Sequence, residues 1–460
     1  MRRLLMILAL CAAASCREAP KRAAAPPAPP KPARAQPPRQ PNFLLIVVDT
    51  LRFDATSLAS GRATDSPHIA ALAGRGISFV NAYSTWDETT GSHFSMLTGF
   101  ATGLETPVND PRLSIPHQLK EHGYKTFGTA ANLMLSPKAT PVVAAFDDYA
   151  CIGDRWKSMT PAQQRAAEPE IAPRLRAYGA KSTDFNKLMA YVTGKRAVAS
   201  LREQLDRTKA PFFGFVNIVE PHDPYFPDPA IYDPKRDEAD LARPKRFDGD
   251  LRNRTLRKVT DRALLKRVAA SRKRVGDRGW QTTFDLDDKA MAIYRRRYQC
   301  EVREADAVIG EIVEMLRERK LLDSTVLIIT SDHGESLGEA DLITHAFGNA
   351  GDRESTHRVP LLWVFPPAYE ARPGKVDVLT SLADVAPTVY EIAGIDWMPI
   401  ANRAPVPGTY GKSLLLRMSE AARRALPWTA RLPAGAITEE QRKQFRSETE
   451  ARQRSLGYLQ

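Results

Sequence analysis

Two short apolar runs, far apart in the sequence, lead into acidic residues. Residues 43–48 read Phe-Leu-Leu-Ile-Val-Val and run into Asp49. Residues 326–331 run in the same way into Asp332 and His333. Unbroken runs of this length, rich in β-branched residues, are typical of strands buried on both faces of a parallel sheet. Because functional crevices lie beyond the carboxyl ends of such strands, we expect these oxygen and nitrogen donors to meet in a metal site.

The rest of the chain alternates strand-like and helix-like segments between residues 42 and 395. One buried strand is expected at 212–219, followed by a proline-rich turn. This alternation predicts an α/β fold with a doubly wound, mostly parallel sheet flanked by helices. Two polar, helical insertions are expected near 152–208 and 228–290, and residues 396–460 are expected to form a small C-terminal subdomain.

The N-terminal segment has the composition of an export signal. A basic start precedes an apolar stretch that is too short to span a membrane, and this stretch leads to Cys16 in a sequence that resembles a bacterial lipobox. We expect residues 1–16 to be a lipoprotein signal peptide with Cys16 lipidated, and residues 17–41, rich in Pro and Ala, to be an extended tether. Arg17 replaces the aspartate that usually retains lipoproteins at the inner membrane, which favours the outer membrane facing the periplasm. Plain secretion is the alternative.

The net charge of +12 is unevenly distributed. Residues 235–278 contain 16 Lys or Arg and 7 Asp or Glu, which gives 16 − 7 = +9. This segment is either a solvated helical face or a surface that attracts anionic lipid, polysaccharide or substrate. No nucleic-acid motif accompanies it, so no nucleic-acid partner is expected. In an exported protein Cys151 and Cys300 could pair, but two spaced cysteines do not establish a disulfide.

Several motifs follow one another in an order that is specific to one family. They are residues 41–52, 89–99, 220–225, 330–335 and 384–388. Together they resemble the sulfatase family of the alkaline phosphatase superfamily, over essentially all of the chain from residue 41 onward. The resemblance implies an α/β fold, a divalent metal ion and hydrolysis of sulfuric or phosphoric esters.

By this resemblance, the ligands of one divalent metal are Asp49, Thr89, Asp332 and His333. Thr50 stands where the family often has a second aspartate, and His333 stands where calcium sulfatases often have asparagine. Both differences remove oxygen ligands. Because calcium requires many oxygens while zinc and manganese accept mixed ligands, we expect zinc or manganese in preference to calcium.

The residue expected to attack the substrate is Thr89. In sulfatases the matching Cys or Ser of a Cys/Ser-x-Pro-x-Arg motif becomes formylglycine, whereas this chain reads Thr-Thr-Gly-Ser-His over residues 89–93. Threonine cannot form that aldehyde, but a metal can activate its hydroxyl to form a covalent ester. A threonine ester cannot release sulfate by C–O cleavage, which favours phosphoryl transfer. The site also resembles those of lipoteichoic acid synthases and phosphoethanolamine transferases. The alternative is that Thr89 only caps the helix that follows.

Five further residues take roles from the resemblance. His222 and His345 are candidates to bind substrate oxygens or protonate the leaving group. His93 replaces the family arginine and is expected either to act in catalysis or to brace the nucleophile loop. Asn132 and Asn217 stand near a substrate-binding lysine and histidine of the family, so substrate binding is expected from uncharged side chains.

The sequence therefore predicts a metal-dependent hydrolase of sulfate or phosphate esters. Its expected partners are an anionic ester substrate and the membrane that holds the N-terminal lipid. Two alternatives remain. One is a transferase of phosphoglycerol or phosphoethanolamine to an envelope glycan or lipid, and the other is a catalytically weak, envelope-tethered binding protein.

Overall fold

The computed structural model describes residues 40–101, 110–178, 182, 184–233, 235, 288–339, 343–345, 352–369, 371–401 and 411–414. The expected signal peptide, Cys16 and nearly all of the tether lie outside these residues. So do most of the expected 228–290 insertion with its basic segment, and most of the expected C-terminal subdomain.

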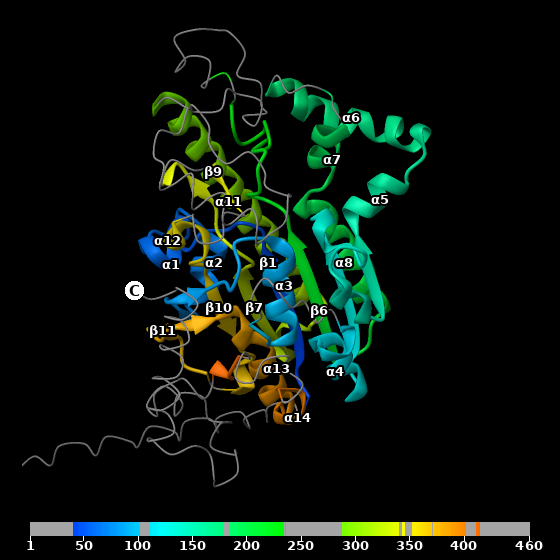
Figure 1. The fold of residues 1–460 in the computed structure, drawn as a ribbon, viewed down its shortest axis with the longest axis vertical. Coiled ribbons are helices and arrows are strands. Elements are labelled where there is room, and N and C mark those ends of the chain that lie inside the picture. The colour runs from blue at the N-terminus through cyan, green and yellow to red at the C-terminus, as the bar shows by residue number, and fades with distance from the viewer. Residues whose placement is uncertain are drawn as a thin grey trace, which may run out of the picture. The chain divides into compact units, whose positions relative to one another are not determined.

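A central sheet of eight strands organises the described residues (Figure 1). The strand order is β11 (Gly374–Val376), β2 (Ile77–Phe79), β10 (Leu361–Val364), β7 (Thr325–Ser331), β1 (Asn42–Val48), β6 (Phe212–Ile218), β4 (Lys125–Ala130) and β5 (Asp148–Cys151). Strands β7, β1, β6, β4 and β5 run parallel to one another, and β10 is antiparallel to both β7 and β2. The predicted mostly parallel sheet is confirmed.

Two short pairs of strands lie outside this sheet. β3 (Ala82–Tyr83) pairs with β12 (Thr380–Ser381), and β8 (Ser336–Leu337) pairs with β9 (Ile343–Thr344).

Helices connect and cover the strands. The described α-helices are α1 (Ser57–Ser60), α2 (Pro67–Ala73), α3 (Thr89–Thr98), α4 (Ile115–Glu121), α5 (Ile152–Ser158), α6 (Pro161–Ala177), α7 (Asp184–Tyr191), α8 (Gly194–Arg207), α11 (Asp288–Glu318), α12 (Arg353–Thr356), α13 (Val385–Ala393) and α14 (Met398–Ala401). The described 3-10 turns are η1 (Phe53–Ala55), η2 (Pro111–Leu113), η3 (Leu133–Leu135), η4 (Pro141–Ala145), η6 (Leu322–Ser324), η9 (Pro367–Tyr369) and η10 (Leu382–Asp384). None of the helices in the described ranges is long and apolar enough to cross a bilayer.

The sheet has a hydrophobic core on each face. In β1 the side chains of Leu44 and Ile46 belong to one core, together with residues of α8 and α11. Phe43 and Leu45 belong to the other, together with residues of α3, α4 and α13. Alternate side chains of a strand point to opposite faces, so an apolar residue is needed at every position of β1. Helices on both faces of the sheet confirm the doubly wound class (Figure 1).

The predicted 152–208 insertion contains helices α5 to α8. Within it, α8 packs on the sheet through buried apolar residues such as Val198 and Leu201. The two cysteines of the described residues, Cys151 and Cys300, are buried and free.

Candidate active site

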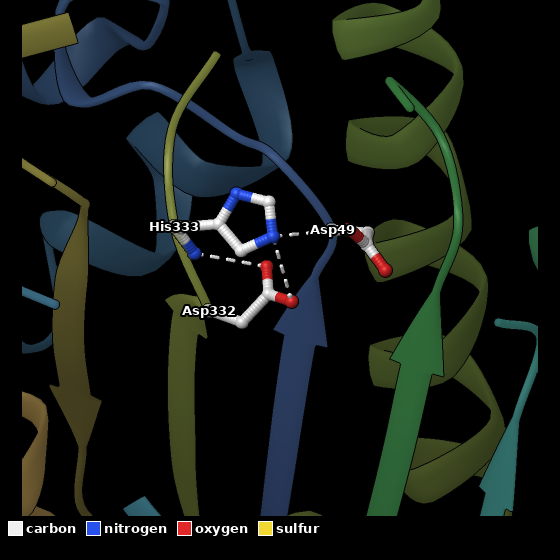
Figure 2. A group of neighbouring side chains, drawn as sticks. All are labelled: Asp49, Asp332 and His333. Carbon is white, nitrogen blue, oxygen red and sulfur yellow. Dashed lines mark hydrogen bonds and ion pairs between the residues drawn. The ribbon is translucent and has the colours of Figure 1, made fainter. Parts of the chain in front are cut away.

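Strands β1 and β7 bring three candidate ligands to one edge of the sheet. The two strands are parallel neighbours, and Val48 pairs with Ser331 at their carboxyl ends. Asp49 and Asp332 therefore leave the sheet side by side, with His333 next to them. One ligand atom from each of these three residues lies within 4.8 Å of the other two (Figure 2). All three side chains are fully buried.

The atoms that face one another in this cluster are all hydrogen-bond acceptors. His333 donates through Nδ1 to the carbonyl oxygen of Gly334 over 2.9 Å, so its Nε2 carries a lone pair. That lone pair lies 3.5 Å from Asp332 Oδ2 and 4.0 Å from Asp49 Oδ1. These three atoms are buried and have no hydrogen-bond partner. Acceptors so arranged repel one another unless a cation lies among them, so the residues fit a divalent metal ion.

Burial also sets the protonation of the cluster. It raises the pKa of Asp49 to about 6, with a contribution from the nearby Asp332 carboxylate. It raises the pKa of Asp332 to about 7 and lowers the pKa of His333 to about 4. The imidazole is therefore neutral, as a metal ligand must be, and protons are the main competitors for the two carboxylates.

The second oxygen of Asp332 is held by backbone donors. Its Oδ1 accepts from the N–H groups of Thr50 over 3.2 Å and His333 over 2.9 Å. Thr50 has a φ of 54°, which is uncommon for a β-branched residue. Its hydroxyl donates to the carbonyl oxygen of Pro221 over 3.0 Å.

The predicted nucleophile, Thr89, is the first residue of α3. The sequence itself predicts a polar loop over residues 84–93 and a helix that opens at Phe94, but α3 begins five residues earlier, at Thr89. The reason is the preceding residue, Glu88, whose side chain caps the helix by accepting from the backbone N–H groups of Thr90 and Gly91. The capping role is therefore filled by Glu88, and Thr89 Oγ1 is available for other contacts.

Asn132 connects Thr89 to the acceptor cluster. Its side-chain nitrogen donates to Asp49 Oδ2 over 2.6 Å and lies 3.3 Å from Thr89 Oγ1. Asn217 supports this arrangement, because its Oδ1 accepts from the backbone N–H of Asn132 over 3.0 Å and its amide lies 3.5 Å from Asp49 Oδ2. Both asparagines, expected to bind substrate, thus also hold Asp49 in place.

His93 contacts the backbone of Thr89, the predicted nucleophile. Its Nδ1 donates to the carbonyl oxygen of Thr89 over 2.8 Å, and the ring is fully buried. Burial lowers the pKa of His93 to about 3, so the imidazole is neutral. This geometry agrees with a bracing role for His93.

The other two predicted histidines extend from the cluster toward solvent. The ring centroid of His345 lies 4.5 Å from that of His333 and 5.0 Å from that of His222. His222 is partly exposed, whereas His345 is only 9% exposed. The structure therefore places both histidines beside the acceptor cluster of Asp49, Asp332 and His333.

Glu335 is a site residue to which the sequence alone assigned no role. It is fully buried, accepts from the Tyr225 hydroxyl over 3.1 Å, and its Oε1 lies 2.9 Å from His345 Nδ1. Burial raises the pKa of Glu335 to about 8. Its position directly after the Asp-His-Gly motif was the available signal, but only the fold shows that it contacts His345.

The fold is that of the ester hydrolases of the alkaline phosphatase superfamily. Within that superfamily the chain belongs to the sulfatase family, because the family's sequence model, described as Sulfatase, matches residues 41–395. Metal dependence is typical of this family, in agreement with the acceptor cluster.

Individual relatives are distant. The chain is 24% identical to a choline-sulfatase of Rhizobium meliloti (strain 1021), covering 77% of this chain and 68% of that protein. It is 26% identical to arylsulfatase K of Bos taurus, covering 78% of this chain and 63% of that protein. The chain thus spans about two thirds of the length of these curated relatives.

Solved structures of similar fold include two phosphonate monoester hydrolases. That of Agrobacterium radiobacter has a TM-score of 0.53 and 18% identity, with 80% of this chain and 78% of that chain covered. That of Silicibacter pomeroyi has a TM-score of 0.51 and 20% identity, with 86% and 78% covered. At these identities the likeness establishes a shared fold.

Proposed function

We propose that this protein is a metal-dependent hydrolase of sulfate or phosphate esters in which Thr89 is the nucleophile. The observation that carries the proposal is the Asn132 amide, which contacts both Thr89 Oγ1 and Asp49 Oδ2. This contact holds the hydroxyl beside the acceptor cluster. Asp49, Asp332 and His333, together with Thr89, would hold one divalent ion, with zinc or manganese favoured over calcium. The ion would lower the pKa of the hydroxyl and neutralise charge on the ester.

The protein's own residues then account for the group transfer. Thr89 Oγ releases its proton to solvent water and forms a bond to the sulfur or phosphorus atom while the bond to the leaving oxygen breaks. His345 or His222 supplies a proton to that oxygen. Water hydrolyses the threonine ester, and Thr89 is regenerated. Fixing the hydroxyl beforehand reduces the entropy that the reaction must lose.

Threonine favours phosphorus over sulfur as the reacting atom, because its ester cannot expel sulfate by C–O cleavage. The names of the distant relatives include both sulfatases and phosphonate monoester hydrolases. We therefore propose both ester classes as substrates, with phosphoric and phosphonic esters preferred.

Two other functions fit the same residues. A transferase would pass the phospho-group from Thr89 to an alcohol of an envelope glycan or lipid, so an acceptor assay distinguishes it from a hydrolase. A weak or inactive binding protein is favoured by the uncharged Asn132 and His93, which stand where the family has cations. Stoichiometric zinc or manganese in the purified protein would argue against the binding protein.

The test is a panel of nitrophenyl sulfates, phosphates and phosphonates, assayed with zinc, manganese or calcium. Thr89→Ala is compared with Thr90→Ala, a matched control whose hydroxyl has no hydrogen-bond partner. Thr89→Ala should lose about a thousandfold or more in kcat, and Thr90→Ala less than about tenfold. Full activity in Thr89→Ala would refute the nucleophile, and a selective loss in Thr90→Ala would transfer the role to that residue.

We also propose that the protein is exported and anchored through a lipid on Cys16. The support is the sequence pattern of residues 1–16. Cys16→Ser should move the protein from the membrane fraction to the soluble periplasmic fraction and abolish labelling by a fatty-acid probe. Unchanged fractionation and labelling would contradict the anchor.

A further inference from the structure

The helical insertion of residues 152–208 contacts the His222 turn, which comprises residues 220–228. Arg174, in the last turn of α6, donates through Nε to the carbonyl oxygen of Phe226. Tyr178 follows α6 directly and donates its hydroxyl to the carbonyl oxygen of Pro227 over 2.7 Å. The centroids of the Tyr178 and Phe226 rings lie 5.8 Å apart. Two side chains of the insertion therefore hold two consecutive carbonyl groups of the His222 turn.

The long helix α11 holds the same part of the turn. Glu301 Oε1 accepts from the backbone N–H of Phe226 over 2.6 Å, and Glu304 accepts from that of Asp228. Arg174 Nη2 donates to Glu304 Oε2 over 3.2 Å, and only 16% of the Arg174 side chain is exposed. Hydrogen bonds between ionised groups are stronger than those between neutral ones, most of all where solvent is excluded. Arg174 therefore joins the insertion, the turn and α11.

The insertion also holds the start of the His222 turn. Glu220 Oε2 accepts from the backbone N–H of Gly194, the first residue of α8, over 2.8 Å. Glu220 is buried, whereas His222 is partly exposed. Arg174, Glu220 and His222 line one small hollow. The residues that hold the turn are therefore close to the histidine that the turn carries.

Both candidate proton donors depend on this turn. His222 belongs to it. Tyr225, three residues further on, donates its hydroxyl to Glu335 Oε2 over 3.1 Å, and Glu335 Oε1 lies 2.9 Å from His345 Nδ1. A displacement of the turn would move His222 and would also remove a partner of the carboxyl group that contacts His345.

We propose that Arg174 is a positioning residue, which fixes the His222 turn so that the histidine that protonates the leaving oxygen is held in place. Arg174 acts through Phe226 and Glu304 and contacts no reacting atom. The insertion thus completes the active site, because a general acid must lie within hydrogen-bond reach of the oxygen that it protonates. This inference rests on the proposed ester hydrolysis and adds to it the residue that positions the proton donor.

The kinetic test uses aryl phosphodiesters whose leaving groups differ in pKa. Arg174→Met keeps a long side chain and removes the donors, and Arg176→Met, at an exposed position of α6, is the matched control. In Arg174→Met, kcat should fall about 100-fold for poor leaving groups and less than about tenfold for nitrophenol, which needs no proton. Arg176→Met should change neither. An equal loss for all esters would overturn the inference, because a general structural defect does not depend on the leaving group.

A milder variant keeps the test decisive if Arg174→Met does not fold. Tyr178→Phe removes only the hydroxyl that donates to Pro227 and keeps the ring. It should reduce kcat about fivefold for poor leaving groups and leave nitrophenyl esters unchanged, since one hydrogen bond is lost. Tyr83→Phe, which removes a hydroxyl bonded to Glu354, is its control. Wild-type kcat for poor leaving groups in Tyr178→Phe would overturn the inference.

Double variants show whether Arg174 acts through a histidine. Arg174→Met is combined with His222→Ala and with His345→Ala. Changes that act through the same group are not additive. With poor leaving groups, the effect of Arg174→Met should shrink to less than about threefold in at least one of the two backgrounds. A full effect in both backgrounds would refute the positioning role.

Hydrogen exchange, measured without substrate, separates this inference from the proposed function. The turn contains the N–H groups of His222, Phe226 and Asp228, which donate to Val219, Glu301 and Glu304. These amides should exchange about tenfold faster in Arg174→Met and at the wild-type rate in Arg176→Met. Faster exchange would support the control of the turn by Arg174 even if the protein hydrolyses no ester and the proposed function fails. Unchanged exchange would overturn the inference even if hydrolysis at Thr89 is established.

Discussion

The side-chain amide of Asn132 donates a hydrogen bond to Oδ2 of Asp49 over 2.6 Å. The carboxylate belongs to the end of β1, whereas the amide lies just beyond the end of β4 and caps the short turn η3. Because the same amide contacts Thr89, it links helix α3 to the sheet. The site therefore depends on three separate segments holding a common position.

Replacing Asn132 should weaken both metal binding at the proposed site and the reactivity proposed for Thr89. Asn132→Ala removes the donor to Asp49 and is expected to lower metal affinity or kcat about 10- to 100-fold, as loss of a residue that orients a metal ligand usually does. Metal titration and steady-state kinetics measure the two effects. Asn81→Ala, which removes an asparagine bonded to Asp377, is the matched control. Wild-type kinetics and metal affinity in Asn132→Ala would show that the link is dispensable.

Metal affinity should fall as the pH is lowered. Burial gives Asp332 a pKa of about 7 and Asp49 a pKa of about 6, so protons compete with the ion below these values. His333, with a pKa of about 4, stays neutral down to about pH 5. Zinc affinity should therefore drop about a thousandfold between pH 8 and pH 5, as competition titrations can measure. In Asp332→Asn only the protonation of Asp49 remains, and zinc affinity should then fall at a lower pH than in the wild-type protein. A zinc affinity of the wild-type protein that does not change with pH would contradict the assignment of these carboxylates as ligands.

The stability of the metal-free protein should fall as the pH is raised, whereas the metal affinity should fall as the pH is lowered. These carboxyl groups have higher pKa values in the folded state than in the unfolded state, so the folded state binds more protons between about pH 4 and 7. Their stabilising contribution is complete below about pH 4 and is lost as the pH rises through 6 to 7. Thermal unfolding of the metal-free wild-type protein should show part of this loss of stability, and the loss should be smaller in the double variant Asp49→Asn/Asp332→Asn. If the wild-type protein and the double variant lose the same stability over this pH range, the two carboxyl groups do not cause the pH dependence.

The sheet and the ligand cluster could be predicted because one local pattern determines both. An apolar run such as Phe43–Val48 must be buried on two faces, and parallel neighbours end at one edge, so Asp49 and Asp332 had to be close. The contacts of Glu335 and Asn132 could not be predicted in this way. They depend on how loops fold over the strand ends, and hydrophobic periodicity carries no information about loops. The start of α3 was misplaced for a related reason, since glutamate is not among the preferred N-cap residues.

Glu335 should act through His345. Glu335→Gln keeps the size of the side chain but changes the partner of His345 Nδ1 from a carboxyl to an amide group. If His345 protonates the leaving oxygen, esters with poor leaving groups should lose about 100-fold in kcat/KM, and esters with nitrophenol leaving groups much less. In a series of aryl phosphodiesters, kcat/KM should depend more steeply on the pKa of the leaving group in Glu335→Gln than in the wild-type protein. Glu354→Gln, a change in a carboxylate paired with Arg358, is the control. A uniform loss across the series would point to a structural role.

The first turn of α3 should tolerate no side chain at Gly91. A Cβ there would lie 2.3 Å from Trp86 Cδ2, so Gly91→Ala must displace the indole, the helix or the Glu88 cap. Overpacking of this kind typically costs about 1–3 kcal/mol, and the displacement reaches Thr89 two residues away. We expect kcat to fall about 100-fold, because a small misplacement of a reacting group has a large effect on rate. Gly374→Ala is the matched control, since no atom lies within 4 Å of a Cβ at that position. If both Gly91→Ala and Gly374→Ala keep the wild-type kcat, the first turn of α3 does not set the position of Thr89. The position of Thr89 would then depend on its contact with Asn132.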